Sequence, residues 1–364
     1  MSIVAETLDG NEQQRPALLD AAVGGDTHRD THSLEMVSGI GAVLSTITID
    51  NDADGYAAVI EWMLEHAPGP RVVIGLEGTR SYGVGLSRAL QAAGFEVVEV
   101  PQPRRADRRA GKSDPLDAHL AALAVLQMPV DRKVLPRSDG DREAMRILLG
   151  ARKDLSTGRT AQINRLRALL LTGEDTDRAL GKGPMSKAQL DLIARRRGLR
   201  GETTEQAVRR AEARRLALAI RAADVALVAT DKQLRDLVNA TAPTLLDGLG
   251  IGPVSGAQAI VSFSHPGRCR NEAAFAALAG ASPIPASSGR THRHRLNRGG
   301  DRQLNRALHT IMLTRWRSCD RTAAYITRRQ QQGLTDREIR RCLKRYIARK
   351  LFRALNHEPP KTQG

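Results

Sequence analysis

The sequence predicts an α/β domain at the start of the chain, followed by a region that is mainly helical. Two observations carry this prediction. Short apolar runs alternate with helically spaced apolar positions over roughly the first third of the chain. The remainder is rich in Ala, Leu and Arg, which favour helix. At 364 residues the chain suits two or three domains, which we place at residues 18–135, 140–240 and 243–356.

The first domain is expected to contain five strands and three helices. Three consecutive strands come first: AAVGGD ending at Asp26, then HSLEMVS and AVLSTITID. A helix over residues 54–66, the strand RVVIGLEG, a helix over residues 82–93, the strand FEVVEVP and the helix DPLDAHLAALAVL follow. This order of strands and helices is that of a ribonuclease H-like domain.

The middle region, residues 140–240, shows helical spacing and no strand pattern. Positions four and three apart, all but one of them apolar, follow the spacing of a heptad seam: Leu216, Ile220, Ala223, Leu227, Thr230, Leu234 and Leu237. This spacing predicts a helical hairpin or coiled coil. The facing helix comes either from the same chain or from a partner chain.

Charge indicates the class of partner. The chain has 56 Lys and Arg against 40 Asp and Glu, a formal net charge of +16, which favours a nucleic-acid partner. The excess lies late in the chain, with thirteen basic and three acidic residues between Arg315 and Arg353. We find no apolar run long enough to span a membrane and no signal peptide, so we expect a cytoplasmic protein. The three cysteines are too widely spaced to predict a disulfide framework or a zinc site.

Four acidic residues form the first candidate site. Asp26 ends the first strand and Glu77 the fourth, while Asp114 and Asp117 lie three apart in the last helix. In a ribonuclease H-like topology these carboxylates converge, and converging carboxylates bind hard divalent cations. Taken singly, each residue fits a turn or a helix start equally well. Together they predict a site for Mg²⁺ or Mn²⁺, suited to phosphodiester displacement.

The second candidate site is an arginine-rich loop. Residues 287–306 hold Ser287 and Ser288, one acidic residue, and six arginines, of which we assign five to nucleic-acid binding: Arg290, Arg293, Arg295, Arg298 and Arg302. The composition taken alone is equally explained by a flexible turn whose arginines form a general phosphate-binding surface. Earlier, Gly250 and Gly252 lie in a glycine-rich turn before a helix, which resembles a helix-hairpin-helix phosphate site.

The motifs themselves resemble those of a known family. GDTHRDTHS around Asp26, GLEGTRSYGVGL around Glu77 and GKSDPLDAHLAA around Asp114 and Asp117 are similar to the three motifs of DEDD-type insertion-sequence transposases, a family that includes Piv-like DNA invertases. GIGPVSGAQAI and SSGRTHRHRLNRGGDRQLNRAL resemble that family's second conserved domain. The resemblance therefore covers nearly the whole chain.

This resemblance implies a two-domain DNA recombinase. It implies a RuvC-like metal domain, a C-terminal transposase domain in which Ser288, or the adjacent Ser287, attacks DNA, a structured non-coding guide RNA, and a homo-oligomer, dimeric or tetrameric, with a composite site. Three alternatives stay open: a metal-dependent nuclease of the Holliday-junction kind, a site-specific invertase, and a catalytically silent nucleic-acid-binding protein. The reaction of Ser288 distinguishes the first of these from a recombinase.

Overall fold

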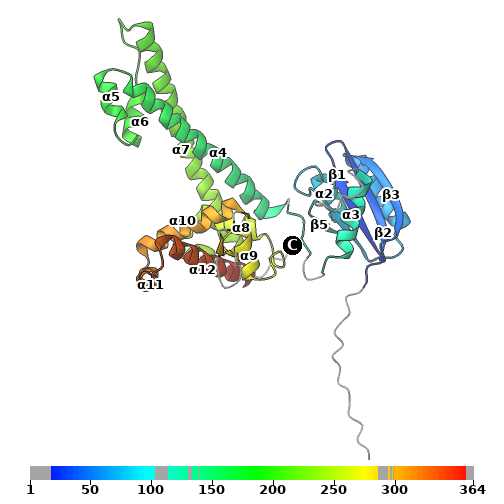
Figure 1. Ribbon diagram of the computed structural model, residues 1–364. Helices are drawn as coiled ribbons and strands as arrows, with labels where there is room; N and C mark the ends of the chain where they lie inside the picture. The colour runs from blue at the N-terminus through cyan, green and yellow to red at the C-terminus, as the bar shows by residue number, and fades with distance from the viewer. Residues whose placement is uncertain are drawn as a thin grey trace, which may run out of the picture. The chain divides into compact units, whose positions relative to one another are not determined.

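The structure is a computed structural model that describes residues 18–102, 114–129, 133–137, 139–285, 294–295, 297 and 299–357. Contacts divide the chain into two compact units, which are considered separately. The first unit runs to Asp139 and includes the short segment Gly267–Arg270, and the second comprises the rest of the chain from Gly140. Figure 1 shows the first unit as a sheet with helices and the second as mainly helical. The second unit also contains a small two-stranded sheet.

The first unit is built on one five-stranded sheet. Its strand order is β3-β2-β1-β4-β5, with β1 antiparallel to β2, β2 antiparallel to β3, and β4 parallel to both β1 and β5. The strands are β1 (Ala21–Thr27), β2 (Thr31–Ser38), β3 (Val43–Asp50), β4 (Val72–Leu76) and β5 (Glu96–Glu99). The central strand β1 is buried along its whole length, as its apolar and glycine sequence predicts.

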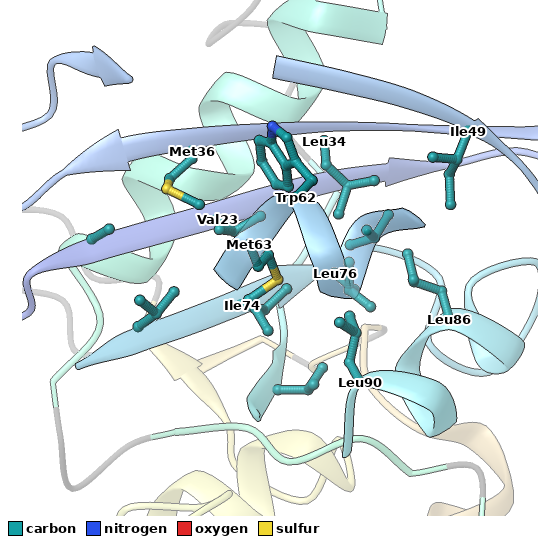
Figure 2. Packing of buried hydrophobic residues seen from close by; sticks show 14 residues of the cluster. Val23, Leu34, Met36, Ile49, Trp62, Met63, Ile74, Leu76, Leu86 and Leu90 are labelled. Atoms are coloured by element: carbon teal, nitrogen blue, oxygen red, sulfur yellow. The ribbon is translucent and has the colours of Figure 1, made fainter. Parts of the chain in front are cut away.

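Three helices cover the two faces of this sheet: α1 (Ala53–His66), α2 (Val84–Ala92) and α3 (Asp114–Leu126). On one face, side chains of α1 and α2 pack with Val23, Leu34 and Ile74 of the strands (Figure 2). On the other face, α3 packs on alternate residues of the same strands, including Ala22 and Val73. The predicted order of five strands and three helices is confirmed, and so is the mixed α/β architecture.

The second unit begins with a long helical hairpin. Helices α4 (Gly140–Leu171) and α7 (Thr204–Thr241) pack against each other, and the short helices α5 (Asp175–Gly181) and α6 (Lys187–Ala194) lie between them in the chain (Figure 1). Of the predicted seam, four residues are buried in α7: Leu216, Ile220, Thr230 and Leu234. Ion pairs Arg152–Asp231 and Arg159–Asp224 join the two long helices. The facing helix thus comes from the same chain.

We predict that Ile220→Ala destabilises this hairpin. Ile220 is fully buried among Leu and Ile side chains of α4, α6 and α7, so truncation leaves a cavity that costs about 2 to 5 kcal/mol. Val225→Ala on the same helix is the matched control, because Val225 is 72% exposed and its loss should change stability by about 0.5 kcal/mol or less. Chemical denaturation followed by far-UV circular dichroism compares the two. Equal unfolding midpoints would contradict this packing.

The remaining helices of the second unit pack at one end of the hairpin. Helix α8 contacts α4, α7 and α10, while α12 contacts α9 and α10, and three phenylalanines from α8, α9 and α12 form an aromatic core. The elements are η2 (Leu245–Asp247), α8 (Pro253–Phe263), α9 (Glu272–Leu278), β6 (Ile284–Pro285), β7 (His294–Arg295), α10 (Arg302–Ser318), α11 (Asp320–Gln331) and α12 (Asp336–His357). None of the described helices has the length and apolarity that a membrane span requires.

Candidate functional site

Asp26 and Glu77 lie side by side at the carboxyl ends of neighbouring strands. Gly25 of β1 pairs with Leu76 of β4, and the backbone N–H of Glu77 donates to the carbonyl oxygen of Gly25 at 3.2 Å, so the ladder continues to the two acids. The hydroxyl of Thr27 donates to the carbonyl oxygen of Glu77 at 3.0 Å and holds the two strand ends together. Both acidic residues are buried. Parallel pairing therefore makes neighbours of two residues that are far apart in the sequence.

Both acids point to the face that α3 covers. A Cβ atom on Gly24 would lie 2.1 Å from the backbone oxygen of Ala118, and one on Gly75 would lie 2.4 Å from a methyl of Val125. Residues 24 and 75 thus face α3 directly. Because side chains alternate along a strand, Asp26, two residues further along β1, faces the same side. Glu77 directly follows β4, and its N–H bond to Gly25 continues the ladder, and with it the alternation, by one residue.

Helix α3 brings Asp117 to the same end of the sheet. The backbone of Ala118 and Ala122 lies over Gly24, whereas Leu123 lies against Gly41, in the turn beside the start of β1. The helix therefore runs back along the strand, and its first turn lies at the carboxyl ends of β1 and β4. Asp117, which is buried, precedes Ala118 in that turn. Asp114 begins the helix, but its side chain lies outside the described residues.

The structure thus places Asp26, Glu77 and Asp117 at one end and one face of the sheet. Their carboxylate oxygens are the donors that hard divalent cations prefer, so the residue types fit Mg²⁺ or Mn²⁺. Among the side chains that the structure describes, no three acidic, histidine or cysteine groups are arranged closely enough to hold a metal ion. The metal site stays a prediction in which Asp114 is the fourth ligand.

A histidine lies beside the first acid. Nε2 of His28 is 3.2 Å from Oδ2 of Asp26, and a proton on that nitrogen would make it a donor to the carboxylate. The His28 side chain is partly open to solvent, and that of Asp26 is not. His28 lies within the first motif, and its contact with Asp26 fits a role in supporting that carboxylate.

Sequence reasoning missed a second carboxylate–histidine pair close to these acids. Glu35 of β2 pairs with Gly24 of β1, is buried, and its carboxylate lies within hydrogen-bonding distance of Nδ1 of His119 on α3. This pair links the sheet to the helix that carries Asp117. A signal was present in the sequence, because Glu35 interrupts the apolar run from Leu34 to Val37 at a position that alternation places on the α3 face.

The glycine-rich turn before α8 is used for packing in the structure. Gly250 has a positive φ of 82°, and an added Cβ would lie 3.1 Å from the backbone oxygen of Ile311 in α10. The backbone N–H of Gly252 donates to the hydroxyl of Ser255 at 3.0 Å. The nucleic-acid role of these two glycines stays a prediction, and the Gly252 N–H would have to exchange its partner to bind a phosphate.

The first part of the arginine-rich loop lies outside the described residues, as does Arg298; this part includes Ser287, Ser288, Arg290 and Arg293. Arg295 pairs with Ile284 in the small β6–β7 sheet, and Arg302 begins α10; both are exposed. Asp301, the acidic residue of this stretch, caps α10 by accepting the N–H groups of Gln303 and Leu304. Its carboxylate is thus engaged by the backbone, which leaves the net positive charge of the stretch in place.

Known proteins similar to this chain identify its class, the transposases. Residues 23–173 match the DEDD-type IS110 transposase family, and residues 242–327 match the family described as transposase IS116/IS110/IS902. A Streptomyces coelicolor protein, assigned as the mini-circle transposase for IS117, is 26% identical over 314 residues, which cover 72% of this chain and 76% of the relative. The chain belongs to the IS110 family of insertion-sequence transposases.

Proposed function

We propose that this transposase cuts and rejoins DNA with Ser288 as the nucleophile and with divalent metals held by Asp26, Glu77, Asp114 and Asp117. One observation carries the proposal: three of these acids are buried at the same end and face of the sheet, on elements that are far apart in the sequence. Such burial is unfavourable unless cations neutralise the carboxylates. The strand order also supports a ribonuclease H-like, RuvC-like first domain.

The chemistry divides between the two sites. Divalent metals, when bound, stabilise the charge on the attacking and leaving oxygens of a phosphodiester displacement. The Ser288 oxygen bonds to phosphorus as the bond from phosphorus to the leaving deoxyribose oxygen breaks, and the serine proton passes to a base. Arginines around Ser288 bind the phosphate oxygens in pairs and hold the DNA in place. A second DNA hydroxyl then displaces the serine and restores the strand.

The partners in this proposal are DNA, a structured guide RNA and further copies of the chain. The net charge of +16 supports a polyanionic partner. The guide RNA and a composite site in a dimer or tetramer rest on the family resemblance. In this arrangement the acids of one subunit act on a strand that is bound to the serine of another.

The nucleophile is tested by Ser288→Ala and Ser287→Ala on labelled DNA that spans the junction of the element encoding the protein. With Mg²⁺ present, we expect Ser288→Ala to lose the covalent protein–DNA adduct and at least about 100-fold of strand cleavage, since alanine has no hydroxyl to form the ester. Ser287→Ala should keep both activities within about tenfold. Denaturing gels separate adduct from free DNA.

Other outcomes of this pair of variants change the assignment. Loss of the adduct in Ser287→Ala with its retention in Ser288→Ala would transfer the role to Ser287. Undiminished cleavage with no adduct in either variant would contradict the serine mechanism and favour a nuclease that uses water.

A further inference from the structure

The second unit contains a cationic pocket that the proposed chemistry does not yet use. Its volume is about 1070 Å³, and its wall, contributed mainly by α10, α11 and α12, carries seven arginines and one lysine against two acids, Asp301 and Glu338. Asp301 caps α10, and Glu338 accepts the backbone N–H and hydroxyl of Thr335 at the start of α12. Two of the arginines, Arg345 and Arg349, form ion pairs with Glu272, which lies outside the wall, at 3.9 Å and 2.7 Å. Among the described residues, the two acids of the wall form no ion pair with its cations, so five arginines and the lysine keep their charge uncompensated by either acid. The pocket therefore favours an anion.

Lys344 shows where the positive charge is least compensated. It is half-buried, and its ammonium donates to the side-chain oxygen of Asn305 at 2.9 Å; Asn305 in turn donates to the carbonyl oxygen of Ala279 at 2.6 Å. A neutral amide does not balance an ammonium charge, and no described carboxylate pairs with Lys344. Burial lowers the pKa of Lys344, and burial together with the charges of Lys344 and Arg340 lowers that of His309. A phosphate would supply the missing negative charge.

Two tyrosines add an aromatic surface to the same wall. The rings of Tyr325 and Tyr346 meet edge to face, with centroids 5.7 Å apart, and Tyr346 is 52% exposed. Arg328 lies 5.5 Å from the Tyr325 ring centre, and Arg349 lies 5.8 Å from the Tyr346 ring centre. Open aromatic rings among cations are typical of sites where bases stack while their phosphates contact Lys and Arg. A paired base in a duplex has both faces covered by its neighbours, so an open ring favours an unpaired base.

The pocket also adjoins the chain that carries the proposed nucleophile. Its wall includes Ser282 and Pro283, just before β6, and Arg295 of β7. The segment with Ser287 and Ser288 leaves from β6 and returns at β7, whose pairing holds its two ends together. A strand bound in the pocket would therefore lie next to both ends of that segment.

We infer that the pocket binds an unpaired nucleotide, with its base stacked on Tyr346 and its phosphate held by Lys344. The shared chemistry is a phosphodiester strand with at least one unstacked base, in DNA or in RNA. This inference rests on the proposed function for the strand's relation to Ser288, but binding itself requires neither the serine nor the acids. It can therefore fail or succeed independently of strand cleavage.

The test is fluorescence anisotropy with the full chain in EDTA. The probes are a thymidine oligonucleotide, a uridine oligonucleotide, an abasic strand of equal length and a DNA duplex. We expect Tyr346→Ala to weaken binding of the thymidine or uridine strand about tenfold, while Tyr346→Phe, which keeps the ring, stays close to the unchanged protein. The thymidine and uridine arms show whether DNA or RNA is the source. The abasic strand should bind more weakly and respond little to Tyr346→Ala.

The charge component has its own variant and control. Lys344→Gln should weaken binding of all single strands about tenfold, including the abasic strand, and lower the salt dependence. Lys232→Gln removes a lysine of the exposed surface of α7, outside the pocket, and should change affinity about twofold or less. Equal binding by Tyr346→Ala and the unchanged protein would overturn the inference. The inference would also be overturned if the duplex bound as tightly as the single strands and if Tyr346→Ala lowered its affinity by the same factor.

Discussion

Asp26→Asn is expected to reduce strand cleavage about 1000-fold or more while the protein stays folded. The substitution keeps the size of the side chain and removes one negative charge from the proposed metal site. A ligand carboxylate contributes several kcal/mol to holding a divalent ion where charge develops, and about 4 kcal/mol corresponds to 1000-fold in rate. Single-turnover cleavage of labelled junction DNA, measured over a range of Mg²⁺ concentrations, gives the rate.

Asp30→Asn is the matched control for this loss. Asp30 lies in the turn that follows β1, its side chain is 73% exposed, and it pairs with the neighbouring Arg29. The Asp30→Asn variant should cleave DNA at a rate within about twofold of that of the unchanged protein, because an exposed ion pair contributes little to stability. Melting curves provide a second measurement: added Mg²⁺ should raise the melting temperature of the unchanged protein and of Asp30→Asn, but not that of Asp26→Asn. Cleavage within tenfold of normal in Asp26→Asn would contradict the metal site.

The first domain could be predicted closely because its local patterns agree with its fold. The helix predicted from DPLDAHLAALAVL is α3 with the same bounds, and the strand expected to end at Asp26 is β1, which continues one residue to Thr27. Apolar runs bounded by turn residues define these elements locally. Strand pairing then follows from the short connections between the first three strands.

Contacts between residues far apart in the chain were harder to predict from the sequence. The heptad spacing in α7 predicted a partner helix but left its source open, and the structure identifies α4 of the same chain. Glu35 and His119 are 84 positions apart, so no local pattern connects them. The use of the Gly252 N–H by Ser255 likewise depends on how the turn closes. In each case the missing information is which distant groups meet, and spacing along the chain does not provide it.

In the candidate site too, the local position of each residue could be predicted from the sequence, whereas the contacts between distant elements could not. Sequence placed Asp26 and Glu77 at strand ends and Asp117 in the first turn of a helix, and each placement agrees with the structure. That the three face one side depends on the close approach of α3 to Gly24 and Gly75. Glycine at these positions is therefore a requirement of the site's geometry, although the sequence alone presents both glycines only as small residues within apolar strands.

Gly24→Ala should accordingly be among the most damaging single-methyl additions in the first unit. The new Cβ would lie 2.1 Å from both the backbone oxygen of Ala118 and the backbone nitrogen of Ala122, and backbone atoms cannot rotate away as a side chain can. Helix α3 must shift off the sheet, at a cost of about 3 kcal/mol or more. The shift would also displace Asp117. The variant should therefore cleave DNA more slowly even at temperatures below its unfolding midpoint, where it is still folded.

Gly150→Ala is the control that separates this effect from the general consequences of replacing glycine. Gly150 lies within α4, and a Cβ there would meet no atom within 4 Å, so alanine should stabilise the helix by up to about 1 kcal/mol. Fluorescence of Trp62, which lies in the core of the first unit, follows unfolding of that unit once Trp316 is replaced by Phe. Far-UV circular dichroism follows the helical second unit, to which Gly150 belongs. Unchanged stability in Gly24→Ala would mean that α3 does not rest on β1 at this glycine, and the convergence of Asp117 with Asp26 and Glu77 would lose its structural basis.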